Sequence, residues 1–165
     1  MICAADIYRA IQALWTAESI DTPFKALWPA SVTPTDYPVL HDGEATPGQP
    51  WPYCVFGVSP SNTAARMSRT TTSKWEIRDV PCEFHVHGKP VTGDTRSAKR
   101  IAAAMAANII NKFGGGPSVA PTAMSLDNGN FLIAQYQNDY GVRTGDEEYQ
   151  WIVAYILRVD VPVLT

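Results

Sequence analysis

The sequence predicts one α+β domain over residues 1–165, with a mainly antiparallel, twisted sheet and two helices packed on it. Three observations support this prediction. The chain has the length of a single domain, and 45% of its 165 residues are hydrophobic. Five Trp, seven Tyr and five Phe indicate an ordered core. Strand-like patterns come in runs around two helical patterns, which favours α+β over a strict strand–helix alternation.

The first predicted element is an amphipathic helix over residues 4–18. Ile7, Ile11 and Leu14 recur at three- and four-residue spacing and form one apolar stripe. The next segment, 19–36, contains three prolines, which exclude a further long helix. We expect bulky side chains to hold this segment against the core, namely Phe24, Leu27 and Trp28.

A short strand over 37–40 comes next, followed by the loop 41–52, whose prolines keep it extended. Residues 53–58 (YCVFGV) form a strand that is apolar almost throughout, as expected for burial on both faces. Segment 59–73 is rich in Ser and Thr and has no apolar periodicity. We therefore expect a long loop or hairpin arm there, or the tips of two long strands.

One long strand, KWEIRDVPCEFHVH, is predicted over 74–87. Its apolar alternation changes phase midway. Trp75 and Ile77 are odd-numbered, whereas the apolar positions from Val80 onward are even-numbered. Because a two-residue period cannot change phase without an extra residue, we expect a β-bulge near 78–81.

A second helix is predicted to begin at Asp94 or Thr95, either of which can cap it, and to run to about Lys112. A run of three glycines, 114–116, ends it. The rest of the chain predicts a β-meander. Its parts are a strand at 122–126, a turn at Asp127-Asn128-Gly129, a strand at 131–142, the acidic loop 145–148 and a final strand at 149–161.

Charge is distributed unevenly along the chain. The formal net charge is −3, but residues 66–112 hold nine basic and four acidic side chains, a net charge of +5, which leaves −8 for the flanks. A nucleic-acid binder is usually basic as a whole, so this pattern favours contacts between protein faces of unlike charge. The side chains expected to make oligomer or partner contacts are Arg66, Arg69, Lys74, Arg78, Asp146, Glu147 and Glu148.

Glu83, His85 and His87 alternate along the long predicted strand and therefore share one side of it. Imidazole and carboxylate groups suit several divalent metals, so a small metal-binding module or enzyme built on these residues is one alternative. Because the residues between them are apolar, the preferred interpretation is an ordinary polar face without metal, cofactor or catalytic residue.

Nothing else in the sequence points to catalysis. Cys3, Cys54 and Cys82 lack CxxC spacing and are expected to be free thiols in a reducing compartment. Neither a GxSxG elbow nor a phosphate loop is present. No apolar run approaches the ~18–20 residues that span a bilayer, and the first residues do not form a secretory signal. We expect a non-enzymatic protein without membrane contact.

These patterns, taken in order, resemble a known family. They are the helix IYRAIQALW, the segment HDGEATPGQPWPYCVF, the Ser/Thr/Arg-rich arm, the strand WEIRDVPCEFHVHG, the helix DTRSAKRIAAAMAANI and the closing meander. This set covers nearly the whole chain and resembles the tail terminator (tail completion, or tail-to-head joining) proteins of long-tailed bacteriophages. The resemblance implies a structural virion protein of the neck, a hexameric ring that caps the tail tube, stops its polymerisation and joins the tail to the head connector.

The resemblance also implies the partners. They are further copies of the same chain in the ring, the tail tube protein and the head-connector or head-completion protein, with DNA only passing through the lumen. The protein would reside in the host cytoplasm during assembly and in the virion afterwards. Another neck component, such as a head-closure or adaptor protein or a minor tail protein, remains an alternative, because these proteins share ring symmetry and small α+β folds.

Overall fold

The computed structural model describes residues 4–58, 62–68, 74–116, 119–126 and 131–162, and for 4, 62–68, 74–77, 131 and 160–162 it describes the backbone alone. The strands are β1 (Leu40–Asp42), β2 (Tyr53–Val58), β3 (Asn62–Ser68), β4 (Lys74–Gly88), β5 (Ala123–Ser125), β6 (Phe131–Arg143) and β7 (Tyr149–Pro162). The helices are α1 (Ala4–Ala17), α2 (Thr22–Lys25) and α3 (Ala98–Phe113).

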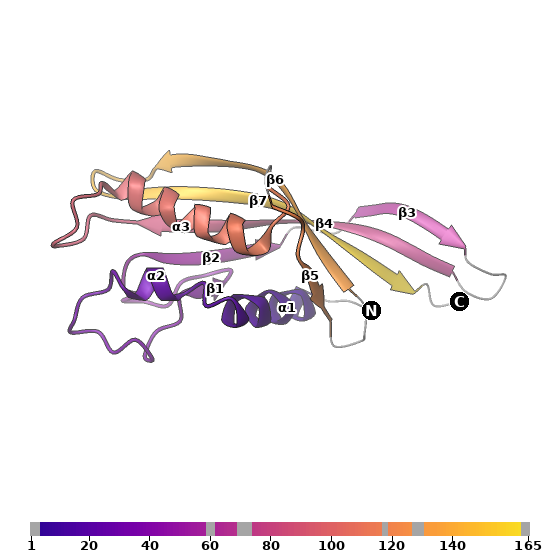
Figure 1. Ribbon diagram of the computed structural model, residues 1–165, viewed down its shortest axis with the longest axis horizontal. Coiled ribbons are helices and arrows are strands. Elements are labelled where there is room, and N and C mark those ends of the chain that lie inside the picture. The colour runs from indigo at the N-terminus through magenta and orange to yellow at the C-terminus, as the bar shows by residue number, and fades with distance from the viewer. Residues whose placement is uncertain (1–3, 59–61, 69–73, 117–118, 127–130, 163–165) are drawn as a thin grey trace.

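The described strands form one sheet in the order β1-β2-β4-β7-β6-β5, with β3 beside the far end of β4 (Figure 1). β1 pairs in parallel with β2, and every other described pairing is antiparallel. The predicted α+β class with a mainly antiparallel sheet is therefore confirmed.

Helices α1 and α3 pack on the same side of the sheet, and the core lies between them and the strands. The even-numbered residues of β4 from Val80 to Val86 and the odd-numbered residues of β7 from Val153 to Val159 point into this core, as alternation in a strand requires. Phe84 lies at its centre and is fully buried. Its ring lies 6.2 Å from that of Trp15 in α1 and 5.0 Å from that of Phe113 in α3, measured between centroids.

The longest described strand pairing in the sheet is the one between β4 and β7. Its 14 paired positions run without interruption from Trp75↔Pro162 to Gly88↔Tyr149. Figure 1 shows that β3 and the adjoining ends of β4 and β7 extend beyond the helices, as an arm at one end of the sheet. The described part of the expected arm at 59–73 is thus a hairpin strand paired with β4, while 59–61 and 69–73 lie outside the described residues.

The β-bulge predicted near 78–81 is wrong. β4 keeps one register with both β7 and β2, and the described bulges lie in β3, between Thr63 and Ala65, and in β6, between Tyr136 and Asn138. From Val80 to Val86 the even-numbered apolar residues of β4 are buried, and towards Lys74 the strand continues in the same register with β7. Because the arm end of β4 extends beyond the helices (Figure 1), no helix determines which side of the strand its apolar residues take, and a change of phase there needs no extra residue.

Two element boundaries also differ from the prediction. The short first strand lies at Leu40–Asp42, because it pairs in parallel with β2 and not with a local hairpin partner. Ser97, and not Asp94 or Thr95, caps α3, since its hydroxyl accepts a hydrogen bond from the amide of Arg100 at 3.4 Å. Asp94 instead binds the amide and guanidinium of Arg96. The predicted turn at 127–129 lies outside the described residues.

Candidate interaction surface

Among the described residues, no helix packs on the second side of the sheet. This open face is made by the odd-numbered residues of β4 from Asp79 to His87, the even-numbered residues of β7 from Gln150 to Arg158, and their neighbours in β2 and β6. Except for Ile152, the described side chains of this set are half-buried or exposed. The open face is therefore the broad surface that the fold leaves available for contact.

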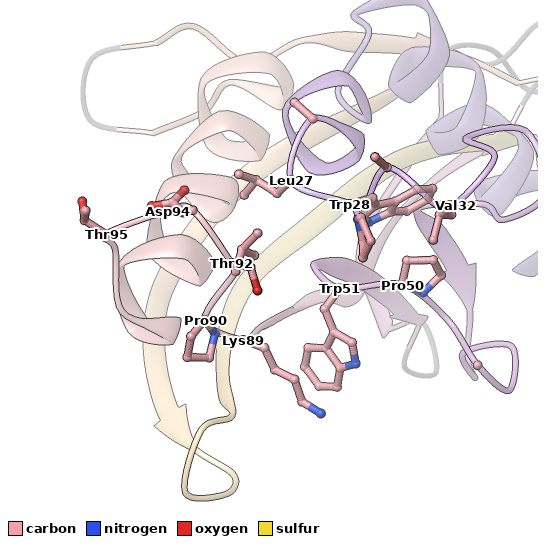
Figure 2. Close-up of a pocket in the computed structure, with 16 residues that line it drawn as sticks. Leu27, Trp28, Val32, Pro50, Trp51, Lys89, Pro90, Thr92, Asp94 and Thr95 are labelled. Carbon is pink, nitrogen blue, oxygen red and sulfur yellow. The ribbon is translucent and has the colours of Figure 1, made fainter.

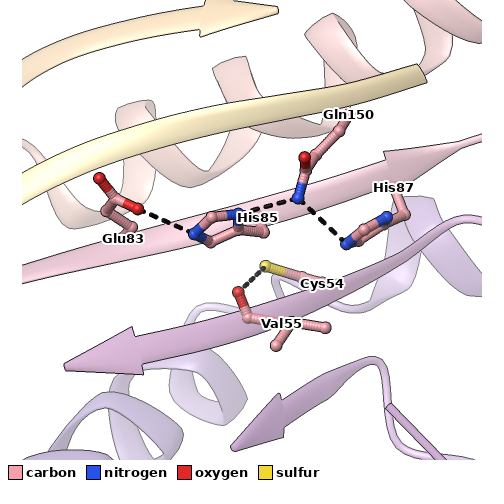
Figure 3. A network of polar contacts seen from close by, with 6 residues as sticks. All are labelled: Cys54, Val55, Glu83, His85, His87 and Gln150. Carbon is pink, nitrogen blue, oxygen red and sulfur yellow. Dashed lines mark hydrogen bonds and ion pairs between the residues drawn. The ribbon is translucent and has the colours of Figure 1, made fainter. Parts of the chain in front are cut away.

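Four side chains on the open face form a polar network, the histidine cluster of Glu83, His85, His87 and Gln150 (Figure 3). The Glu83 carboxylate Oε2 lies 2.9 Å from His85 Nε2. The amide Nε2 of Gln150 lies 2.8 Å from His85 Nδ1 and 3.5 Å from His87 Nε2. The alternation seen in the sequence thus places three of the residues together, and Gln150 joins them from β7.

His87 is also part of an aromatic stack. Its ring lies 4.7 Å from that of Tyr53 at an interplanar angle of 11°, and Trp51 meets it edge-on. Burial lowers the pKa of His87 to about 4, with the nearby His85 as a smaller cause. His87 is therefore a neutral ring at neutral pH. Three members of the cluster, His85, His87 and Gln150, line a shallow pocket of about 410 Å³ together with the β1–β2 loop at residues 43–45.

Three large hydrophobic side chains are exposed on the open face along β6. Ile133 is 39% exposed, Tyr140 48% and Val142 40%. The bulge in β6 places the odd-numbered Ile133 on the same side as the two even-numbered residues. The sequence prediction missed this row, although the phase change between positions 133 and 140 could have indicated it. Nearby, the Asp79 carboxylate and the Arg158 guanidinium form a bidentate pair across the strands, at 2.9 and 3.0 Å.

The structure separates the predicted contact residues into two groups at opposite ends of the β4–β7 ladder. Arg66 lies opposite Glu76 in the arm, and Lys74 begins β4 there. Arg78 is half-buried and pairs in register with Val159, closer to the core. The arm end and the β6–β7 turn are roughly 46 Å apart at ~3.3 Å per residue of strand. Arg69 and the side chains of Arg66 and Lys74 lie outside the described part.

The acidic group, Asp146, Glu147 and Glu148, forms the turn between β6 and β7. The Glu148 carboxylate pairs with Lys89 Nζ at 2.7 Å, and Asp146 contacts the Arg143 guanidinium at 3.3 Å. Because both pairs are within the chain and solvent-exposed, they contribute little to stability. Asp146 and Glu147 remain exposed at the tip of the molecule. The basic and acidic residues predicted to make contacts therefore belong to opposite ends of the β4–β7 ladder.

A groove of about 1030 Å³ lies beside Lys89, between the loop after α2 and the β4–α3 loop (Figure 2). Leu27, Trp28 and Trp51 give it a largely apolar lining. Its two charged lining residues are already paired, Lys89 with Glu148 and Asp94 with Arg96. Trp28 Nε1–H donates to the carbonyl of Pro52 at 2.9 Å. Both charged side chains that line the groove are therefore already in ion pairs.

The remaining candidate groups are structural. Cys54 and Cys82 are buried free thiols, and burial raises the pKa of both, so they stay protonated and unreactive. Cys3 lies outside the described residues. In the described chain, no three His, Cys, Asp or Glu side chains converge as a preformed metal site. A bilayer-spanning helix is absent from the described residues.

Comparisons with known proteins add little to this geometry. No family model matches the sequence, and no curated protein matches it either. One solved structure aligns with 96% of this chain and 96% of its own, at 17% sequence identity and a TM-score of 0.44. Similarity at that level carries no argument about function.

Proposed function

We propose that this protein is a structural virion subunit, a tail terminator that forms a hexameric ring on the phage tail tube, stops tube polymerisation and joins the tail to the head connector. The proposal starts from the ordered sequence patterns that resemble this family over nearly the whole chain. The observation that carries it in the structure is the open face, with Ile133, Tyr140 and Val142 exposed on it.

Exposed hydrophobic side chains grouped on one face are typical of surfaces that bind another protein. Here they lie along one strand beside a polar cluster, and the described residues offer no catalytic arrangement in either concave site. A surface that is partly apolar with interspersed polar groups fits an assembly contact.

The charge distribution supports head-to-tail assembly. A closed ring uses two different patches on each subunit, one of which meets the other on the next copy. The arm and the acidic β6–β7 turn are two such patches of unlike charge in sequence, and they lie at opposite ends of the sheet.

Two measurements test the proposal. Negative-stain electron microscopy and light scattering of the purified protein should show rings with a central pore at high concentration. Compact monomers at all concentrations would contradict the ring. The second measurement is binding to polymerised tail tube protein, which a terminator should cap at one end. Binding to the head connector alone would identify the protein as another neck component, the alternative assignment.

A further inference from the structure

We propose that His85 and His87 bind a divalent transition metal ion of the Zn²⁺ class on the open face, in the position that the Gln150 amide occupies between the two rings. This inference is independent of ring assembly. It differs from the sequence-based alternative, in which Glu83 was a ligand, because the structure gives Glu83 another role.

Glu83 determines which nitrogen of His85 carries the proton. A carboxylate can only accept, so His85 Nε2, at 2.9 Å from Glu83 Oε2, must donate. His85 Nδ1 is then an unprotonated nitrogen with a lone pair. The amide Nε2 of Gln150 can donate but not accept, and it lies 2.8 Å from that nitrogen, as this tautomer requires.

The same amide nitrogen also faces His87. His87 Nε2 lies 3.5 Å from it, so the two imidazole rings direct acceptor nitrogens toward one point (Figure 3). The His-x-His spacing on β4 produces this convergence, because alternate residues of a strand share a side. One NH₂ group cannot serve both nitrogens equally well, since 3.5 Å is at the limit of a hydrogen bond. A cation satisfies two lone pairs better than one amide does.

The surroundings match those of protein metal sites. A histidine that binds a metal usually donates its other ring N–H to a carboxylate, which orients the ring and makes it a stronger ligand, and Glu83 does so for His85. Once displaced, the Gln150 side chain can present its carbonyl oxygen. Glu44 is exposed and lines the same pocket, so the β1–β2 loop can supply a carboxylate.

The chemistry of the donors selects the class of ion. Two imidazole nitrogens with oxygen ligands suit Zn²⁺, Co²⁺, Ni²⁺ and Cu²⁺, whereas Mg²⁺ and Ca²⁺ prefer oxygen alone. The pocket opens to solvent, which gives the ion a path of entry. The site is not a preformed cage, because among the described residues no third His, Cys, Asp or Glu converges on it.

The test is calorimetric titration of the full-length, tag-free protein with Zn²⁺, in a C3S background so that this thiol cannot contribute. The expected result is one ion bound per chain, with at least tenfold weaker binding in H85Q and in H87F. The H87F substitution keeps a ring against Tyr53, and circular dichroism with thermal unfolding verifies that each variant folds. E83Q should weaken binding about 10–100-fold through the loss of the orienting carboxylate.

A matched control separates a positioned site from any two neighbouring histidines. I133H/Q135H, made in the H85Q/H87F background, places the same spacing on the same face without a carboxylate partner. The proposal expects this pair to bind at least tenfold more weakly than the native pair. With Co²⁺ as probe, the visible absorption of nitrogen-ligated cobalt should disappear in H87F. Equal affinity of the control pair, unchanged binding in folded H87F, or no stoichiometric binding in the C3S protein would each overturn the inference.

Discussion

At the scale of single residues, packing converges on Phe84. Its ring centroid lies 5.0 Å from those of Phe56 and Phe113, 6.0 Å from that of Tyr155 and 6.2 Å from that of Trp15. These rings belong to two other strands and to both long helices. One side chain thus joins both helices to the middle of the sheet.

We predict that Phe84→Ala lowers the free energy of unfolding by about 3–5 kcal/mol, because it leaves a cavity where five aromatic rings meet. Urea denaturation measures the change. Phe84→Leu, which keeps most of the apolar volume, should cost only about 1 kcal/mol. A loss below 1 kcal/mol in the alanine variant would show that the core closes around the missing ring.

His41 gives a prediction on pH. It is buried, and burial lowers its pKa, outweighing hydrogen bonds that favour the charged ring. The unfolded chain therefore takes up a proton near the ordinary pKa of about 6.5 while the folded chain does not. The contribution of neutral His41 to the free energy of unfolding is therefore fully present above that pH. It is lost as the pH falls, because the unfolded chain then binds a proton that the folded chain does not.

Urea midpoints of wild type and His41→Gln at pH 7.5 and 5.5 test this prediction. The wild-type protein should lose more stability on acidification than the variant. Because His85 and His87 are present in both proteins, the difference isolates His41. Equal losses in the two proteins would show that His41 titrates alike in the folded and unfolded chain.

At the scale of elements, α3 depends on a cap that local sequence could not single out. Asp94, Thr95 and Ser97 all favour the N-cap position. The structure assigns it to Ser97, since Asp94 is held by Arg96. We predict that Ser97→Ala costs about 1 kcal/mol, a fall of roughly 2–4 °C in melting temperature. Thr95→Ala should leave the melting temperature within about 1 °C, and an equal effect of both would contradict the assignment.

The elements that sequence predicted well are those whose evidence is local. The helix expected at 4–18 is α1 (Ala4–Ala17), and the strand expected at 53–58 is β2 with the same bounds. Apolar spacing within a few residues determines both. β1 was misplaced because its partner is a parallel strand reached through a loop, and pairing of that kind leaves no periodic signal.

The same distinction applies to the open face. Alternation placed Glu83, His85 and His87 on one side of a strand, which the structure confirms. Gln150 could not be predicted, because its position depends on the register between β4 and β7, which are far apart in sequence. The exposed row on β6 depends on a bulge, and single-sequence alternation locates bulges poorly, as the misplaced bulge in β4 shows.

At the scale of the whole molecule, the arm is the part whose removal should leave the fold intact. Among the described strands, β3 pairs only with β4, and β4 keeps its own pairing with β7. We predict that replacing 61–72 with a short Gly-Ser turn leaves a folded protein that does not form rings. Light scattering after gel filtration measures the mass, and circular dichroism the fold.

A charge-reversed control, R66E/R69E, keeps the backbone of the arm. If the arm contributes through charge, this variant should also assemble weakly. The difference in assembly between the variant and the wild type should shrink in 0.5 M salt, because salt at that concentration screens exposed charges beyond about 4–5 Å. Persistence of the oligomer in the deletion variant at high concentration would exclude the arm from the contact.

The uninterrupted β4–β7 ladder has a mechanical consequence. Its 14 paired positions lie along the long axis of the molecule. Opposed pulls on β4 and β7 along that axis load all the hydrogen bonds in shear at once, whereas a pull across the strands would unzip them one after another. The molecule should therefore resist tension far better along its long axis than across the strands.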